Sequence, residues 1–207
     1  MPARSAPQKR DREGTETRIV DAAARVLARD GAAGFGINAV AAEAGADKKL
    51  IYRYFGDMDG LIAAMGARLD LWAGPAEPPA EGDAYGDRMA HLIAAYGRHV
   101  RGDLLLQRLL AWELSEDAPA LRALDLARSR AMQSAMPALR GADGPPEGVD
   151  APAINAVLLA AVNYLALRQR TMGRFAGLDL STAAGQARAD AAIAFLMSRA
   201  YAPKAKR

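Results

Sequence analysis

The chain has 207 residues, of which 51% are hydrophobic and 25% are charged, so it can bury a substantial core and is not disordered overall. It contains no cysteine, which excludes disulfide frameworks, thiolate metal sites and cysteine nucleophiles, and suits a reducing compartment. The formal net charge is +3. This excess lies in residues 1–56, which contain ten lysines and arginines and seven acidic residues. A basic segment before a neutral remainder suits a polyanionic partner for the first part only.

Residues 1–14 are polar and contain almost no apolar side chain, which predicts a flexible tail. They lack the apolar stretch of a signal peptide. Lys9, Arg10 and Arg12 could form a basic arm over a polyanion, although a solvated tail is the simpler interpretation.

Apolar residues at helical spacing predict four helices in the first third of the chain, at residues 15–30, 37–44, 47–55 and 57–72. Gly31 is expected to end the first helix, and Gly45 to form the turn between the second and third. Asp47 and Asp57 are placed to cap the third and fourth helices. A stretch rich in proline and glycine at residues 74–82 then indicates a linker.

Five further helices are expected, at residues 85–100, 104–114, 121–139, 153–167 and 181–201. Residues 153–167 are apolar on nearly every side, which indicates burial on several sides. The apolar run Ala156–Leu167 is interrupted by Asn163 and is too short to cross a bilayer, so no membrane partner is expected. No segment alternates like a strand, and the predicted fold class is therefore all-α, with about nine helices.

The third predicted helix carries the strongest chemical signal in the chain. Leu50, Ile51 and Phe55 are spaced to face inward, which leaves outward and flanking positions for basic and aromatic side chains, namely Lys48, Lys49, Tyr52, Arg53 and Tyr54. A helix, a glycine turn and a basic, aromatic helix form the pattern of a helix-turn-helix that enters a DNA major groove. A helix of this length spans roughly 12 Å, which fits the groove.

The segment from Ile37 to Phe55, followed by Asp59 and Leu61, closely resembles the DNA-binding domain of TetR/AcrR-type repressors. The Ala-Gly turn and the Tyr-x-Tyr-Phe ending carry the resemblance, which runs from about Thr17 to Leu61. The rest of the chain matches the family only in size and helical layout.

Four positions depart from the family pattern. Phe35-Gly36 stands where a threonine is usual, Asp47 replaces the capping serine, and Lys49 replaces a common glycine. Met58 replaces a basic residue that is common early in the fourth helix, and Lys48 or Lys49 is the candidate to compensate for the phosphate contact.

The resemblance implies a helix-turn-helix DNA-binding domain at residues 15–73 and a larger helical domain at 83–202 for effector binding and dimerisation, followed by a basic tail at 203–207. Lys48 and Lys49 would meet the groove first, while Arg53 would read guanine or clamp the backbone. The expected DNA-contacting residues are Arg18, Gly36, Asn38, Lys48, Lys49, Leu50, Tyr52, Arg53 and Tyr54.

One short helix makes too few contacts for specific binding, so a homodimer on a palindromic operator is expected, with half-sites about 34–36 Å apart. The resemblance implies a four-helix interface built by residues 153–167 and 181–201 of two subunits. Its candidate residues are Ala156, Ala160, Ile193, Leu196 and Met197. The alternative for residues 153–167 is an ordinary central core helix.

The family also places an effector pocket in the second domain. Its candidate lining residues here are Met89, Tyr96, His99, Trp112, Met132, Met136, Tyr164 and Arg168. Such a pocket would be apolar and adaptable, and would take a small apolar or aromatic effector. The alternative is that the methionines and Trp112 are core residues and His99 is a hydrogen-bonded residue at the edge of its helix.

The sequence thus predicts a cytoplasmic, ligand-responsive transcriptional regulator, a repressor that its effector releases from the operator. A constitutive DNA-binding repressor or activator without an effector is the alternative. Two histidines, no cysteine and no phosphate-binding loop leave little from which to build an enzyme, so we expect no catalysis, metal or cofactor.

Overall fold

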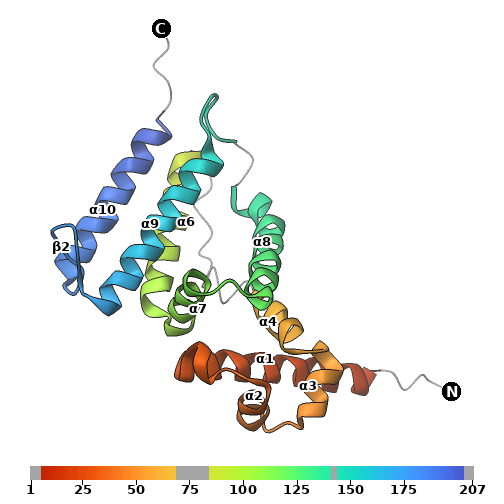
Figure 1. Ribbon diagram of the computed structural model, residues 1–207. Coiled ribbons are helices and arrows are strands. Elements are labelled where there is room, and N and C mark those ends of the chain that lie inside the picture. Colours follow the sequence, from red (N-terminus) through yellow and green to blue (C-terminus); the bar gives the residue numbers. More distant parts are fainter. Residues whose placement is uncertain (1–5, 69–83, 141–143, 203–207) are drawn as a thin grey trace. The chain divides into compact units, whose positions relative to one another are not determined.

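The computed structural model describes residues 6–68, 84–140 and 144–202 (Figure 1). Within these ranges it contains nine α-helices and one two-stranded hairpin, so the all-α prediction is confirmed. The chain divides into two compact units. Unit 1 comprises residues 1–71 and 108–131, and unit 2 comprises residues 72–107 and 132–207.

Unit 1 contains four helices from the start of the chain: α1 (Ala6–Gly34), α2 (Ile37–Ala44), α3 (Lys48–Phe55) and α4 (Met58–Gly66). It also includes the second part of α7 (Leu104–Ser115) and the first part of α8 (Pro119–Arg140). The predicted bounds of α2 are confirmed, and α3 begins one residue after its predicted start, with Asp47 as its N-cap. Asp57 caps α4 by accepting from the Gly60 amide at 2.8 Å, as predicted. The predicted linker at 74–82 lies outside the described residues.

Helix α1 begins nine residues before the predicted start, so the prediction of a flexible tail is wrong for residues 6–14. Its early turns are held by local polar contacts. Arg12 Nε donates to Glu16 Oε1 at 2.7 Å, and Thr17 Oγ1 donates to the Glu13 carbonyl at 3.0 Å. These turns are solvated and have no apolar face, so apolar periodicity could not predict that they are helical. The helix kinks at Gly31, where its predicted end lies.

The core of unit 1 lies where α1, α2, α3 and α4 meet, and the predicted apolar faces are buried there. The buried side chains from these helices include Ile19, Val26, Leu27, Val40, Ile51, Leu61, Ile62 and Met65. Glu43 of α2 accepts from Arg25 Nε at 2.8 Å and from Arg29 Nη1 at 2.7 Å, which ties α2 to α1. These two hydrogen bonds hold the pKa of the Glu43 carboxyl below its usual range.

Residues 108–131 pack on the N-terminal segment of unit 1 at α1, Phe35 and α4, although the sequence assigned them to the second domain. The Phe35 and Trp112 rings meet edge to face at 5.9 Å, and Arg108 Nη1 donates to the Leu27 carbonyl at 3.4 Å. At Gly66 the backbones of α4 and α8 approach closely, because an added Cβ would lie 2.6 Å from the Leu124 carbonyl oxygen. Helix α4 therefore rests directly on α8.

Unit 2 is built on α6 (Tyr85–Gly102), α9 (Ala151–Thr171) and α10 (Ala183–Ala200). Asp150 caps α9 by accepting from the Ala153 amide at 3.1 Å. Strands β1 (Arg174–Phe175) and β2 (Leu178–Asp179) pair as an antiparallel hairpin between α9 and α10. This hairpin was not predicted, because two-residue strands are too short to show the alternation of polar and apolar residues. Both connecting residues have positive φ, as a tight hairpin turn requires.

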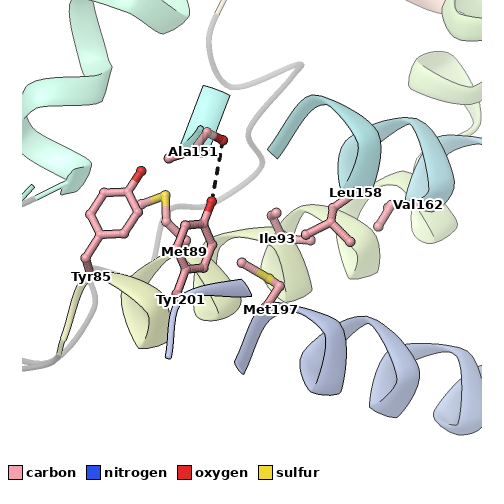
Figure 2. Close-up of a cluster of buried hydrophobic side chains, with 8 residues drawn as sticks. All are labelled: Tyr85, Met89, Ile93, Ala151, Leu158, Val162, Met197 and Tyr201. Atoms are coloured by element: carbon pink, nitrogen blue, oxygen red, sulfur yellow. Dashed lines mark hydrogen bonds between the residues drawn. The ribbon is translucent and has the colours of Figure 1, made fainter. Parts of the chain in front are cut away.

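The core of unit 2 gathers aromatic, methionine and aliphatic side chains from α6, α9 and the end of the chain (Figure 2). They are Tyr85, Met89, Ile93, Ala151, Leu158, Val162, Met197 and Tyr201. The Tyr85 and Tyr201 rings meet edge to face at 5.3 Å. The Tyr201 hydroxyl donates to Asn155 Oδ1 at 2.7 Å and lies 3.4 Å from the Ala151 carbonyl oxygen (Figure 2). This phenol is therefore both buried and hydrogen-bonded.

The buried phenol makes the stability of unit 2 depend on pH. Burial raises the pKa of Tyr201 to about 12, and Tyr85 adds to the shift. Because this exceeds the ordinary value of about 10, the stabilisation is intact below pH ~10 and is lost as the pH rises toward the folded-state value. We expect the free energy of unfolding from urea titrations to fall in that window, and Tyr201→Phe to flatten the fall. An equally steep fall in Tyr201→Phe would contradict this.

Helices α9 and α10 both pack on α6 and leave their opposite sides exposed. Large apolar side chains on those sides are Val157 (68% exposed), Tyr164 (44%), Phe195 (58%) and Leu196 (55%). By length and composition, α9 is the one helix in the described ranges that is apolar enough to cross a membrane, and only 22% of its apolar window is buried. The helix has 21 residues and extends beyond the apolar run Ala156–Leu167 on both sides.

Candidate DNA-binding surface

The turn between α2 and α3 has the geometry that its glycine predicts. Gly45 adopts φ 59° and ψ 37°, the left-handed conformation that other residues rarely adopt. The Ala46 amide then donates to the Ala41 carbonyl at 3.0 Å, which closes the end of α2. Asp47 caps α3 by accepting from the Lys49 amide at 2.8 Å. These contacts fix the angle at which α3 leaves α2.

Helix α3 is strongly two-sided. Ile51 is fully buried, and Leu50 and Phe55 are partly buried, so the inward face predicted from their spacing is confirmed. The exposed side chains are Lys48, Lys49, Tyr52 and Arg53. Neither lysine forms an ion pair with a residue in the described ranges, and the same holds for exposed Arg18 of α1. The outer face of α3 therefore presents unneutralised positive charge.

Tyr54 is half-buried and held in place by its neighbours. Arg53 Nη2 donates to the Tyr54 hydroxyl oxygen at 3.0 Å, and the Arg53 guanidinium carbon lies 5.0 Å from the centre of the Tyr54 ring. The Tyr54 and Phe55 rings meet edge to face at 6.4 Å. Since the phenol oxygen already accepts a hydrogen bond, its own proton remains available for an acceptor outside the protein.

The two candidates at the start of α2 lie on the protein surface. Asn38 is exposed, and Gly36 occupies the N-cap position in an extended conformation. No side chain caps α2, so its first backbone N–H groups lack the partner that Asp47 gives to α3. An added Cβ at Gly36 would meet no atom within 4 Å, so the surface beside Gly36 is open.

The eight predicted effector-pocket residues are distributed over both units. Met89 is part of the unit 2 core in Figure 2, whereas Trp112 belongs to unit 1 and packs on Phe35. Tyr164 meets the Phe175 ring of the hairpin at 4.9 Å, with the Arg168 guanidinium carbon 6.0 Å from the same ring. Tyr96 donates to Asn163 Oδ1 at 2.7 Å, while His99, Met132 and Met136 are partly buried.

The predicted interface residues fall into two groups. Ala156, Ala160 and Leu196 are exposed. Ile193 packs against the unit 2 core, and Met197 is only 1% exposed, so Met197 belongs to that core and not to an outer surface. Ile193 and Met197 were predicted in the interface, and exposed Phe195 was missed. From the sequence alone, an apolar helix face that packs on α6 cannot be distinguished from one that packs on another subunit. The seven-residue spacing of Val157 and Tyr164 places them on one face of a helix, so the sequence could have predicted that they share this apolar surface.

The exposed cationic helix after a capped glycine turn defines a helix-turn-helix DNA-binding protein, in keeping with the sequence prediction. Residues 19–65 match the family model described as bacterial regulatory proteins, tetR family. The chain is also 35% identical over 162 residues to the HTH-type transcriptional repressor SCO4008 of Streptomyces coelicolor, which covers 75% of this chain and 80% of that protein. The chain therefore belongs to the TetR family of transcriptional regulators, and the resemblance is confirmed.

Solved structures share the fold over nearly the whole chain. The multidrug binding protein EbrR complexed with imidazole superposes with a TM-score of 0.56 at 24% identity, over 93% of this chain and 97% of that one. FadR from Bacillus subtilis in complex with stearoyl-CoA gives a TM-score of 0.57 at 15% identity, over 87% and 96%. TetR-family regulators are soluble DNA-binding proteins that usually act as dimers and are not enzymes.

Proposed function

We propose that this chain is a cytoplasmic repressor that binds a palindromic operator as a homodimer and leaves it when a small ligand binds. The exposed, unneutralised charge on α3 is the observation that carries this proposal. The repressor role is supported by the 35% identity to a transcriptional repressor.

In the DNA complex, α3 would lie in the major groove with Lys48 and Lys49 leading. The Tyr54 hydroxyl would donate to a phosphate, because its oxygen already accepts from Arg53. Because Arg53 is already hydrogen-bonded to the Tyr54 hydroxyl, we favour a clamp on the DNA backbone over guanine reading for this residue. Tyr52 would contact a phosphate or a thymine methyl group, beside partly buried Leu50.

The start of α2 would supply further phosphate contacts. Its uncapped N–H groups lie behind Gly36, where no side chain blocks a phosphate, and the helix dipole favours an anion there. Asn38 and Arg18 are exposed and would contact the backbone on either side. Such contacts fix the register of the protein without reading sequence.

The exposed apolar sides of α9 and α10 are proposed as the homodimer interface. Val157 and Phe195 are each more than half exposed, as Leu196 is, and contiguous exposed apolar area of this kind marks an association surface. Small residues at Ala156 and Ala160 would let the helix of a second copy approach closely. A four-helix interface would cover these side chains and would also explain why α9 is apolar nearly all round.

Placing charge in this proposed interface is expected to separate the subunits. In Val157→Glu combined with Leu196→Glu, dimer formation would have to bury carboxylates away from water, which is unfavourable. Sedimentation equilibrium should therefore show monomers at concentrations where the parent chain is dimeric. Selection from random DNA should return an inverted repeat for the parent chain and no enriched site for the variant. The matched control is Leu126→Glu, which replaces a 51% exposed leucine on α8. A variant that stayed dimeric would refute this interface.

The effector belongs to the proposal as well. EbrR was solved with imidazole and FadR with stearoyl-CoA, which supports a ligand-responsive role for a chain of the same fold. We propose an apolar or aromatic effector, which would act through its differential affinity for two conformers that space the recognition helices differently. A constitutive repressor or activator is the alternative. A thermal-shift screen over chemically varied ligands with no response at all would favour that alternative.

A further inference from the structure

Arg12 lies beside the candidate DNA-binding surface, although it precedes the helix-turn-helix in the chain. It stands on an early turn of α1, seven residues before buried Ile19. Its guanidinium carbon lies 5.4 Å from the centre of the Tyr54 ring. The solvated start of α1 therefore reaches the same side of unit 1 as the outer face of α3.

The contacts of Arg12 orient its guanidinium and leave most of its donors available. Its Nε donates to Glu16 Oε1 at 2.7 Å, and no other hydrogen bond of Arg12 is present among the described residues. Both terminal nitrogens, with four N–H groups, are thus free to donate. The side chain is 62% exposed, and its hydrogen bond to Glu16 raises the pKa of Arg12 above an already high ordinary value. The group is a permanent, pre-oriented cation.

We propose that Arg12 contacts a DNA phosphate beside the one that Tyr54 contacts, so that the DNA-binding surface extends onto the solvated start of α1. This inference rests on the proposed placement of α3 in the major groove. The Arg12 guanidinium carbon lies over the Tyr54 ring, 5.4 Å from its centre, and the two free terminal nitrogens suit a bidentate contact with phosphate. The ring is itself fixed by Arg53, so Arg12 and Tyr54 act as one unit.

The test compares Arg12→Ala with Arg122→Ala. Arg122 is also an arginine of unit 1 with a 62% exposed side chain and one acidic partner, Asp117, so its loss removes the same charge from another helix. Operator affinity is measured by fluorescence anisotropy over a range of salt concentrations. Loss of one phosphate contact per subunit predicts a salt slope shallower by about 1.8 and at least about tenfold weaker binding at 0.1 M salt. Arg122→Ala should match the parent chain.

Two further results decide the role of Arg12. Arg12→Lys should keep the parent salt slope but recover only part of the affinity, because lysine retains the charge and loses the planar fork. In a Tyr54→Ala background, Arg12→Ala should lose much of its effect, since the ring that supports the guanidinium is gone.

The failure of this inference is distinguishable from failure of the proposed function. If the parent chain binds no selected operator, the proposed function falls. If the parent chain binds and Arg12→Ala shows the same affinity and salt slope, the inference on Arg12 alone is overturned. Circular dichroism of each variant checks the fold, and a lost helical signal in Arg12→Ala would also overturn it by assigning Arg12 a structural role.

Discussion

Replacing Lys48 and Lys49 together with alanine is expected to weaken operator binding about a thousandfold at 0.1 M salt. Both side chains are exposed on α3 and unpaired within the described part of the chain, so the folded protein does not use them. A dimer would lose four phosphate contacts, each worth about 0.9 in the salt slope. The slope of log affinity against log salt should therefore become shallower by about 3.6.

The control for this variant is the pair Arg122→Ala and Arg130→Ala, which removes two exposed cations from α8 and leaves α3 intact. If net charge alone attracted DNA, this pair would weaken binding as much as the lysine pair does. Equal losses in the two variants, or a lysine variant within threefold of the parent chain, would refute the assignment of the α3 face. Thermal unfolding should be unchanged in both, since none of these side chains is buried.

Gly66→Val is expected to lower the free energy of unfolding of unit 1 by about 2 kcal/mol, in the range for overpacking a close contact. An added Cβ would lie 2.6 Å from the Leu124 carbonyl oxygen and 3.2 Å from the Ala127 Cβ, so α4 and α8 must separate. For a unit of this size, the shift corresponds to a fall of about 10 °C in Tm. Operator affinity should fall as well, because α4 supports α3.

Gly14→Ala is the matched control, because an added Cβ at this solvated position of α1 would meet nothing within 4 Å. Alanine has the higher helix propensity, so this variant should be as stable as the parent chain or slightly more so. Calorimetry of the three proteins decides the matter. A Gly66→Val Tm within 2 °C of the parent value would mean that α4 and α8 are not in backbone contact.

Local signals predicted the helix-turn-helix closely. Asp47 and Gly45 fix the start of α3 and the turn before it through their own backbone and capping contacts, so neighbouring sequence was sufficient. The start of α1 was missed for the opposite reason. Its first turns are stabilised by polar pairs such as Arg12 and Glu16, so the sequence there has no apolar periodicity from which a helix could be predicted.

Contacts between segments far apart in the chain could not be predicted from apolar periodicity, because periodicity shows which face of a helix is buried but not what covers it. Trp112 was expected in an effector pocket of the second domain, but its ring packs on Phe35, 77 positions earlier in the chain. Met197 and Phe195 lie on one apolar helix, and only the position of α6 decides that the first is buried and the second exposed. The pocket residues remain a prediction for the same reason, since a cavity depends on how several helices pack.

Helices α7 and α8 each run without a break from one unit into the other. Residues 108–131 of these two helices belong to unit 1. Within this segment, Arg108, Trp112 and Leu124 contact the N-terminal part of the unit. A gene fragment that stops after α4 would therefore encode the helix-turn-helix without the α7 and α8 residues that pack against the N-terminal part of the unit. A truncated DNA-binding unit would need residues 108–131 as well as the first 71 residues in order to keep these contacts.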